Sequence, residues 1–257
     1  KFLFKYAKEA LTLGKHVLVE KPGSHNKEQM KELENLAKKH KLILMVGFNY
    51  RFFDGIAEAK TLVDKGKIGD ILSMRIKHGH AGRIGYEKEW RMNKKDAGGG
   101  TLMDQGVHVI DLSLWFMSRE PHLVRSLQSN NFWKANVEES AFVLLKNKDK
   151  QMASLHVSIT EWKPTFLMEI FGTKGYCIVS GLGKKYDDGE KLSVGILNKD
   201  YSTVEKTKKY RTKPFDSVRR ELECFVNSVN KNTNLGPSGA DAVRVLSVVD
   251  KAYKNNE

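Results

Sequence analysis

Two apolar runs near the start of the chain constrain the fold more than any other feature of the sequence. HVLV (16–19) and LILMV (42–46) are continuously hydrophobic, as strands buried on both faces of a parallel sheet are. Residues 2–13 and 27–40 precede these runs and carry apolar side chains at helical spacing, and Asn26 is placed to cap the second helix. The order helix, strand, helix, strand predicts a doubly wound α/β unit.

The sequence pattern changes after residue 50. From residue 71 onward apolar and polar residues alternate with period two, and turn-like strings such as GTKG link some of the runs. This pattern predicts a large, open and mostly antiparallel sheet. The expected strands are 71–79, 140–147, 152–160, 165–172, 175–181 and 192–197, and the expected helices are 54–65, 217–231 and one from about 239 that Ser238 caps. The predicted fold class is α/β plus α+β, with a partial doubly wound parallel sheet at residues 1–50 and a second domain at residues 51–257.

The chain opens on a helix that leads into a parallel strand, as the second half of a dinucleotide-type domain would. No G-x-G-x-x-G string, which would place a pyrophosphate at a helix N-terminus, occurs near the start. We therefore expect the first half of that domain to be absent from this chain. The chain is then either a fragment of a longer enzyme or a truncated product, and a truncated product would need its open sheet edge covered, for example by another subunit.

The composition of the chain limits the kinds of binding partner and the cellular compartment that we expect. Lys and Arg number 44 against 31 Asp and Glu, and the lysines are scattered rather than gathered in a stripe among aromatic residues. We therefore expect a solvated lysine-rich surface or an anionic small substrate, and no nucleic acid partner. No apolar run reaches the length of a membrane span and the start lacks the pattern of a signal peptide, so no membrane association is expected. Cys177 and Cys224 are far apart in the sequence, which favours a reducing, cytoplasmic location.

Polar residues follow both apolar runs. Glu20 and Lys21 come where the first run ends, and Pro22 holds Lys21 in an extended conformation. Asn49 and Arg51 follow the second run. Open parallel sheets bind ligands at the carboxyl ends of their strands, so these side chains are candidates for one crevice. An ordinary solvated strand end or loop accounts for either group equally well when it is considered alone.

A third group lies in the string GGGTLMDQGVHVIDLSLWF. Asp104, His108 and Asp111 fall at i, i+4 and i+7, which is one stripe of an otherwise apolar helix. A stripe that faces solvent is one interpretation, and a metal site is a weaker one, because nothing nearby completes the ligand set. His78 and His80 form a similarly weak metal candidate. The favoured hypothesis is acid–base chemistry by an imidazole that a carboxylate holds in one tautomer, with the glycines before the helix giving substrate access to backbone amides; no metal is expected.

The strings GKHVLVEKP, GFNYRF, EWRMNKKDAGGGTLMDQGVHVIDL and FGTKGYCIVSGLG, in this order, resemble the Gfo/Idh/MocA family of NAD(P)-dependent oxidoreductases. The resemblance implies a Rossmann domain followed by a substrate-binding and oligomerisation domain with an open sheet. It also implies hydride transfer between a sugar-like alcohol carbon and the nicotinamide of NAD or NADP. The string TEWKPTFLMEIFGTKGYCIVSGLGKKY (160–186) resembles members associated with nucleotide-sugar or polysaccharide metabolism, which implies a sugar or nucleotide-sugar substrate.

The resemblance also implies roles for individual residues. Lys21 corresponds to the lysine beside the nicotinamide and the reacting hydroxyl, His108 to the general base, and Asp104 to the polar residue one turn before it. The implied cofactor-binding residues are Glu20, Lys21, Pro22, Asn49, Arg51, Trp90 and Arg91. The implied substrate-binding residues are Lys21, Arg83, Tyr86, Asp104 and His108.

Two other functions remain open at this point. The chain could be a non-catalytic binding or regulatory remnant of the same fold, or a relative that uses NAD to cleave glycosidic bonds. We further expect a homo-oligomer, because the large sheet of the second domain offers a face for self-association.

Overall fold

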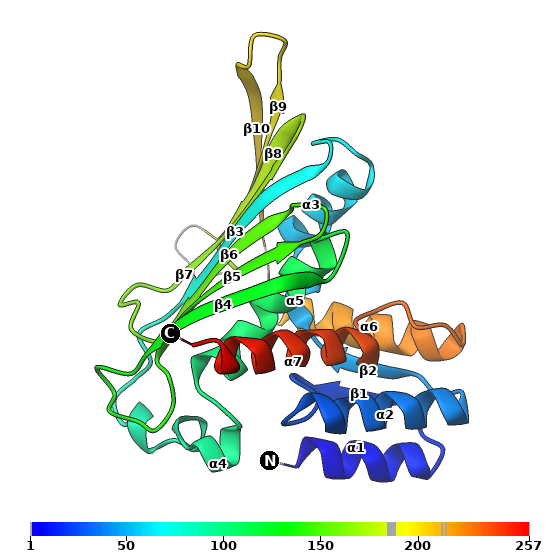
Figure 1. Ribbon diagram of the computed structural model, residues 1–257. Coiled ribbons are helices and arrows are strands. Elements are labelled where there is room, and N and C mark those ends of the chain that lie inside the picture. The colour runs from blue at the N-terminus through cyan, green and yellow to red at the C-terminus, as the bar shows by residue number, and fades with distance from the viewer. Residues whose placement is uncertain (1, 184–188, 212, 214, 257) are drawn as a thin grey trace.

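The amino-terminal part of the chain folds into a small parallel sheet with helices packed beside it (Figure 1). The computed structural model describes residues 2–183, 189–211, 213 and 215–256. The elements of this part are α1 (Leu3–Thr12), β1 (Val17–Glu20), α2 (Lys27–His40) and β2 (Leu44–Gly47). β1 and β2 run parallel with Glu20 opposite Gly47, so the carboxyl ends of both strands meet at one edge of the sheet.

Eight strands form the second sheet. They are β3 (Ile71–Gly79), β4 (Pro121–Ser129), β5 (Ser140–Asn147), β6 (Met152–Ser158), β7 (Thr165–Gly172), β8 (Gly175–Ser180), β9 (Glu190–Leu197) and β10 (Thr203–Tyr210). Their order across the sheet is β10-β9-β8-β7-β3-β6-β5-β4. Every neighbouring pair is antiparallel except β3 and β6, which run parallel. Along β5 and β7 buried side chains alternate with more exposed ones, so the sheet buries one face against the helices.

The remaining α-helices lie before, between and after these strands in the sequence. They are α3 (Asp54–Asp64), α4 (Lys94–Ala97), α5 (Val107–Phe116), α6 (Asp216–Asn230) and α7 (Gly239–Lys254). α5 packs on β3 and β6, α3 packs on β8 and β9, and α7 packs on β4 (Figure 1). In the part of the chain that the structure describes, no helix combines the length and the apolar character that a membrane crossing requires.

α7 joins the two sheets into one core. It begins with a capping box in which the Ser238 hydroxyl accepts a hydrogen bond from the Asp241 amide (3.1 Å) and the Asp241 carboxylate accepts one from the Ser238 amide (3.0 Å). The helix contacts α2 and β2 on one side and α5 and β4 on the other. Val46 of the small sheet and Ile76 of the large sheet consequently belong to one continuous hydrophobic cluster.

The predicted fold class is confirmed, because a partial Rossmann-type parallel sheet is followed by a large, mostly antiparallel one. The helix at 27–40 and the strand at 71–79 have the predicted limits, and Ser238 caps α7 as expected. Two strands were not predicted. β4 contains a register shift that breaks its alternation, and β10 is lysine-rich and almost wholly exposed, so neither shows the period-two apolar pattern. The division at residue 50 stays a prediction.

Candidate active site

A cavity of about 310 Å³ opens at the carboxyl ends of β1 and β2, where ligands bind to open parallel sheets. Five parts of the chain line it, and the residues include Glu20, Lys21, Asn49, Arg91, Asp104, His108 and Glu221. The structure therefore brings together the ends of both predicted strands and the polar helix, as the sequence predicts. α6, which contributes Glu221, was not expected there.

A second cavity of about 800 Å³ runs along α1 and β1 beside the first. Both cavities are lined by Glu20, Lys21, Arg91 and Asp104, so the two spaces adjoin at these four residues. Pro22 and Trp90 also line the larger cavity. All of the predicted cofactor-binding residues except Arg51 therefore contact one or both spaces.

Lys21 and Asp104 form the charged pair at the junction of the two cavities. The Lys21 ammonium lies 2.5 Å from Asp104 Oδ1 and also donates to the backbone carbonyl of Asp104. Burial raises the pKa of Asp104. The charge and hydrogen bond of Lys21 and the charge of Arg91 lower that pKa by a larger amount, so it lies below the usual value for an aspartate. Asp104 is therefore an anion at neutral pH, and it orients Lys21 rather than the imidazole of His108.

His108 is held by stacking rather than by a carboxylate. Its ring lies parallel to that of Tyr50, with centroids 4.0 Å and planes 8° apart, and Tyr50 Oη lies 3.3 Å from Nε2 of His78. Within the described part of the chain, His108 Nδ1 has no hydrogen-bond partner. The sequence predicts that a carboxylate fixes the tautomer of the His108 imidazole. This prediction is wrong, because no carboxylate among the described residues hydrogen bonds to Nδ1 of the ring.

The electrostatic environment of His108 favours its neutral form. Burial, followed by the positive charge of Lys21 and the neighbouring His78, places the pKa of His108 well below the usual value. Burial of His78, followed by the charge of His80, lowers the pKa of His78 to about 3. His108 is therefore available as a proton acceptor at neutral pH.

Gly100, the last of the three glycines before the helix, allows the backbone to pack closely against Glu138. The Glu138 carboxylate accepts hydrogen bonds from the amides of Gly100 (3.0 Å) and Leu102 (2.9 Å) and from Tyr253 Oη (2.9 Å). A Cβ atom at Gly100 would lie 2.1 Å from the Glu138 carbonyl oxygen, so no larger residue fits. The Gly100 amide is therefore occupied, contrary to the expectation that it is open to substrate, while Gly99 still lines the larger cavity.

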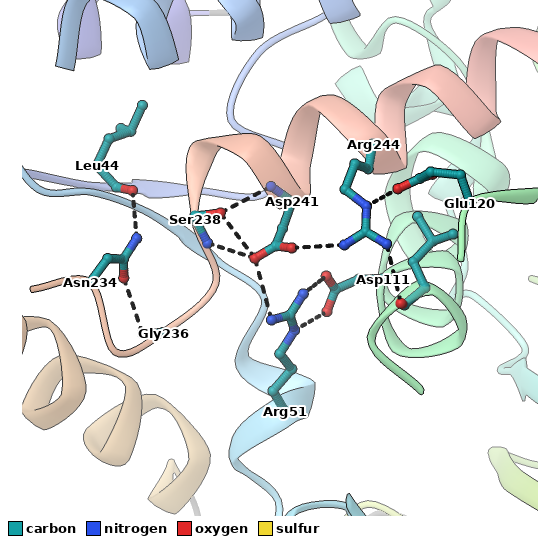
Figure 2. A network of polar contacts seen from close by, with 10 residues as sticks. Leu44, Arg51, Asp111, Glu120, Asn234, Gly236, Ser238, Asp241 and Arg244 are labelled. Atoms are coloured by element: carbon teal, nitrogen blue, oxygen red, sulfur yellow. Dashed lines mark hydrogen bonds and ion pairs between the residues drawn. The ribbon is translucent and has the colours of Figure 1, made fainter. Parts of the chain in front are cut away.

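Arg51 and Asp111 form a buried ion pair behind the cavity (Figure 2). Arg51 Nε donates to Asp111 Oδ2 (2.8 Å) and Arg51 Nη2 to Oδ1 (2.5 Å), and Arg51 Nη1 lies 3.5 Å from Asp241 Oδ2. The side chains of Arg51 and Asp111 are 9% and 1% exposed. Asp241 in turn contacts Arg244, which pairs with Glu120. Arg51 was predicted to bind cofactor, but the structure directs its guanidinium to these two carboxylates.

Two predicted substrate contacts lie outside both cavities as far as the described residues show. The Arg83 guanidinium is two-thirds exposed and pairs with Glu89 at 2.7 Å. Tyr86 is buried beside Trp133, and burial together with the charge of Asp104 raises its pKa to about 12. Their role in binding substrate stays a prediction.

Two residues of the site escaped the sequence analysis. Tyr50 lies within the quoted string GFNYRF, so its place at the end of a buried strand was a usable signal. Glu221 lies in a helix that is amphipathic throughout, and no spacing or neighbouring motif distinguishes it from the other acids of that helix. Only the tertiary contact between α6 and the turn that follows β2 brings it to the cavity.

Comparison with known proteins places this geometry in a family. Residues 3–48 match the family described as "Oxidoreductase family, NAD-binding Rossmann fold", and residues 56–178 match the "GFO/IDH/MocA C-terminal domain". The two matches follow each other in the chain and together cover more than half of it. The chain belongs to the Gfo/Idh/MocA family of oxidoreductases. Its amino-terminal elements are thus part of an NAD-binding Rossmann fold.

Individual relatives agree with this assignment. The uncharacterized oxidoreductase YrbE of Bacillus subtilis is 25% identical over 96% of this chain and 71% of its own length. A levoglucosan dehydrogenase of Pseudarthrobacter phenanthrenivorans is 34% identical over 42% of this chain, but only 28% of its own length. The solved structure of a levoglucosan dehydrogenase in complex with NADH and levoglucosan superposes with a TM-score of 0.88 at 22% identity, covering 99% of this chain and 75% of that one. At this identity the structural likeness shows a shared fold.

The residues at the end of β1 fit the nicotinamide end of a dinucleotide. Lys21 and Arg91 supply positive charge where the two cavities adjoin, and Trp90, which is 55% exposed, offers an aromatic surface in the larger one. The unpartnered Nδ1 of His108 marks a buried polar atom beside the same junction. Members of the family bind a nicotinamide cofactor. The described residues that could hold the nicotinamide end of that cofactor are Glu20, Lys21, Trp90 and Arg91.

The environment of His108 leads to a first prediction. Because burial and Lys21 hold its pKa well below the usual value, the imidazole stays neutral, and its Cε1 proton should not shift in NMR spectra between about pH 8 and 5. A titration of His108 with a midpoint near 6.5 would contradict the account.

The buried ion pair leads to a second prediction. Arg51→Met leaves Asp111 buried without its partner, so chemical denaturation should show a loss of about 3–5 kcal/mol in the free energy of unfolding. Arg219→Met removes an exposed pair with Glu223 and should cost less than about 1 kcal/mol. Equal, small losses for the two variants would show that the buried pair does not hold the site.

Proposed function

We propose that the protein is a dehydrogenase that transfers hydride between a hydroxyl-bearing carbon of a sugar or nucleotide-sugar and NAD(P). The observation that supports it most is the placement of a cationic lysine and a neutral imidazole, Lys21 and His108, in one cavity at the carboxyl ends of parallel strands. Oxidation of an alcohol needs both groups, because a proton must leave the hydroxyl as negative charge develops on its oxygen. The names of the relatives support a sugar as the substrate class.

His108 is the proposed proton acceptor. When an alcohol is oxidised to a carbonyl, the carbon loses a hydride and the oxygen loses a proton, which the neutral imidazole can take. NAD(P), when bound, supplies the acceptor for the hydride. The Tyr50 ring stacked on His108 would stabilise the imidazolium that forms, because an aromatic face attracts a cation.

Lys21 is the proposed electrostatic partner of the reacting oxygen. Its ammonium is a fixed positive charge at the wall of the cavity, and Asp104 holds it in place. A negative charge that develops on the substrate oxygen is stabilised by such a preorganised cation more strongly than by water. Asp104 is thus a positioning residue that acts through Lys21. The net charge of +13 would in addition favour encounter with an anionic nucleotide-sugar.

We also propose that the protein self-associates through the open face of the large sheet. Leu127, Phe142, Leu144 and Met152 lie on the adjacent strands β4, β5 and β6, and each is 50–57% exposed. A patch of large apolar side chains on neighbouring strands is typical of an interface between protein molecules. Cys177 and Cys224 are free thiols, which supports the proposal that the protein acts in a reducing, cytoplasmic compartment.

Substitution of the two central residues tests the catalytic proposal. In the full-length protein, His108→Ala should lower kcat/KM for sugar oxidation by about 10²–10⁴-fold, and Lys21→Met should lower it by at least about 10²-fold. NAD(P)H formation is followed by its absorbance, and His122→Ala, an exposed histidine on β4, is the control that should keep full activity.

Product analysis separates the proposal from its rivals. Release of an aglycone without accumulation of NADH would identify the relative that cleaves glycosidic bonds. No turnover and no rise in melting temperature with NAD+ or NADP+ would identify the non-catalytic remnant. Turnover by His108→Ala within about three-fold of the parent protein would remove His108 from the mechanism.

The proposed interface leads to a further prediction. Phe142→Lys places a charge in the centre of the apolar patch and should convert the assembly to monomers, as measured by analytical ultracentrifugation. Leu13→Lys changes an exposed leucine after α1 and should leave the assembly intact. A parent protein that sediments as a monomer, or a Phe142→Lys variant that remains assembled, would contradict the interface.

A further inference from the structure

Glu221 of α6 is a buried carboxyl that the proposed chemistry does not use. The residue is 4% exposed, and within the described part of the chain its Oε1 atom has no hydrogen-bond partner. It lines the same 310 Å³ cavity as Lys21 and His108. Its neighbour one turn earlier, Ser217, is by contrast engaged by the Asn49 side chain at 3.4 Å.

A carboxyl in this state destabilises the fold. A buried polar atom without a partner costs about 1–3 kcal/mol, and an ionised one costs more. Burial, followed by the negative charge of Glu20, raises the pKa of Glu221 to about 8, so the group is largely protonated at neutral pH. A leucine would fill the same space without this cost, which indicates that the carboxyl is retained for a contact with a ligand.

The neighbouring groups define what that ligand can be. The charged and titratable side chains that line the cavity with Glu221 are Glu20, Lys21, Tyr50, Arg91, Asp104 and His108. Lys21 and Asp104 are already paired, and Glu20 adds negative charge on the side of Glu221. Beside Glu221 itself, a phosphate or carboxylate of a ligand would meet the negative charge of Glu20 and would be disfavoured relative to a neutral group. A neutral carboxyl has one O–H donor and a carbonyl acceptor, and a hydroxyl group matches both.

We infer that Glu221 is a further substrate-binding residue, whose carboxyl hydrogen bonds a second hydroxyl of the sugar while His108 takes the proton of the first. This inference rests on the proposed function, since it assumes a polyhydroxylated substrate in this cavity. A cavity of about 310 Å³ lies at the lower end of the range for small-ligand sites. Lys21 directly follows β1, His108 lies on α5 and Glu221 on α6, so the substrate would be held from separate elements.

The inference is tested with substitutions at Glu221 in the full-length protein. Glu221→Leu removes both hydrogen-bonding atoms, and Glu221→Gln keeps the shape and a donor and an acceptor but cannot ionise. Glu223→Gln, at an exposed position of the same helix, is the matched control. Activity is measured with the parent sugar and with its series of monodeoxy analogues, each of which lacks one hydroxyl.

Glu221→Leu should lower kcat/KM for the parent sugar by about 10–100-fold, mainly through KM, while Glu221→Gln retains most of it. One monodeoxy analogue should be a poor substrate of the parent protein by a similar factor and should lose no further activity in Glu221→Leu, because the lost contact is the same one. Glu223→Gln should match the parent protein throughout.

Two measurements besides turnover separate binding from a structural role. The melting temperature of Glu221→Leu should equal or exceed that of the parent protein, because an unpartnered buried carboxyl has been removed. The dissociation constant of NADH, measured by fluorescence, should not change. A lower melting temperature with unchanged KM would assign Glu221 a structural role, and a weakened NADH affinity would assign its contact to the cofactor, and either result overturns the inference.

The outcome also distinguishes this inference from the function on which it rests. If the parent protein oxidises no sugar with NAD+ or NADP+, both the proposed function and the proposed role of Glu221 are contradicted. If the parent protein is active and Glu221→Leu has the same activity on every analogue, only the proposed role of Glu221 is contradicted.

Discussion

The ion pair between Arg51 and Asp111 is the contact on which the geometry of the site depends. Arg51 follows β2, Asp111 lies on α5, and Asp241 of α7 completes the charge balance (Figure 2). One guanidinium therefore ties the strand end that opens the cavity to the helix that carries His108. Buried pairs of this kind add little net stability, but removing one partner is costly, so they hold elements in one arrangement.

That arrangement sets the charge of each group in the cavity. Asp104 remains charged because Lys21 is its partner, which lowers the pKa of the carboxyl. His108 stays neutral because it is buried near a cation, and Glu221 takes up a proton because it is buried near another carboxylate. The site thus holds a lysine–aspartate pair, a neutral imidazole and a neutral carboxyl within one small space. This combination suits the oxidation of one hydroxyl and the recognition of another.

Much of the fold follows from local patterns, while part of the site follows only from tertiary contacts. The continuous apolar runs and the alternating strands predicted both sheets, and the position of Lys21 at a strand end followed from the topology. The role of Arg51 did not follow, because a strand-end arginine can equally face a ligand or a buried acid from a distant helix. Glu221 was beyond reach for the same reason, since only the packing of α6 makes it differ from the exposed Glu223. The exposed, lysine-rich β10 lacked an apolar face and could be recognised only by its pairing with β9.

The transfer of a hydride from substrate carbon to nicotinamide is the central claim of this account. It is tested by incubating the full-length protein with NAD(P)+ and a sugar deuterated at each candidate carbon in turn, followed by mass spectrometry of both products. The account predicts that deuterium from one carbon appears in the reduced nicotinamide while that carbon becomes a carbonyl. Deuterium that stays in the sugar product at every position, or returns to it without net formation of NAD(P)H, would contradict it.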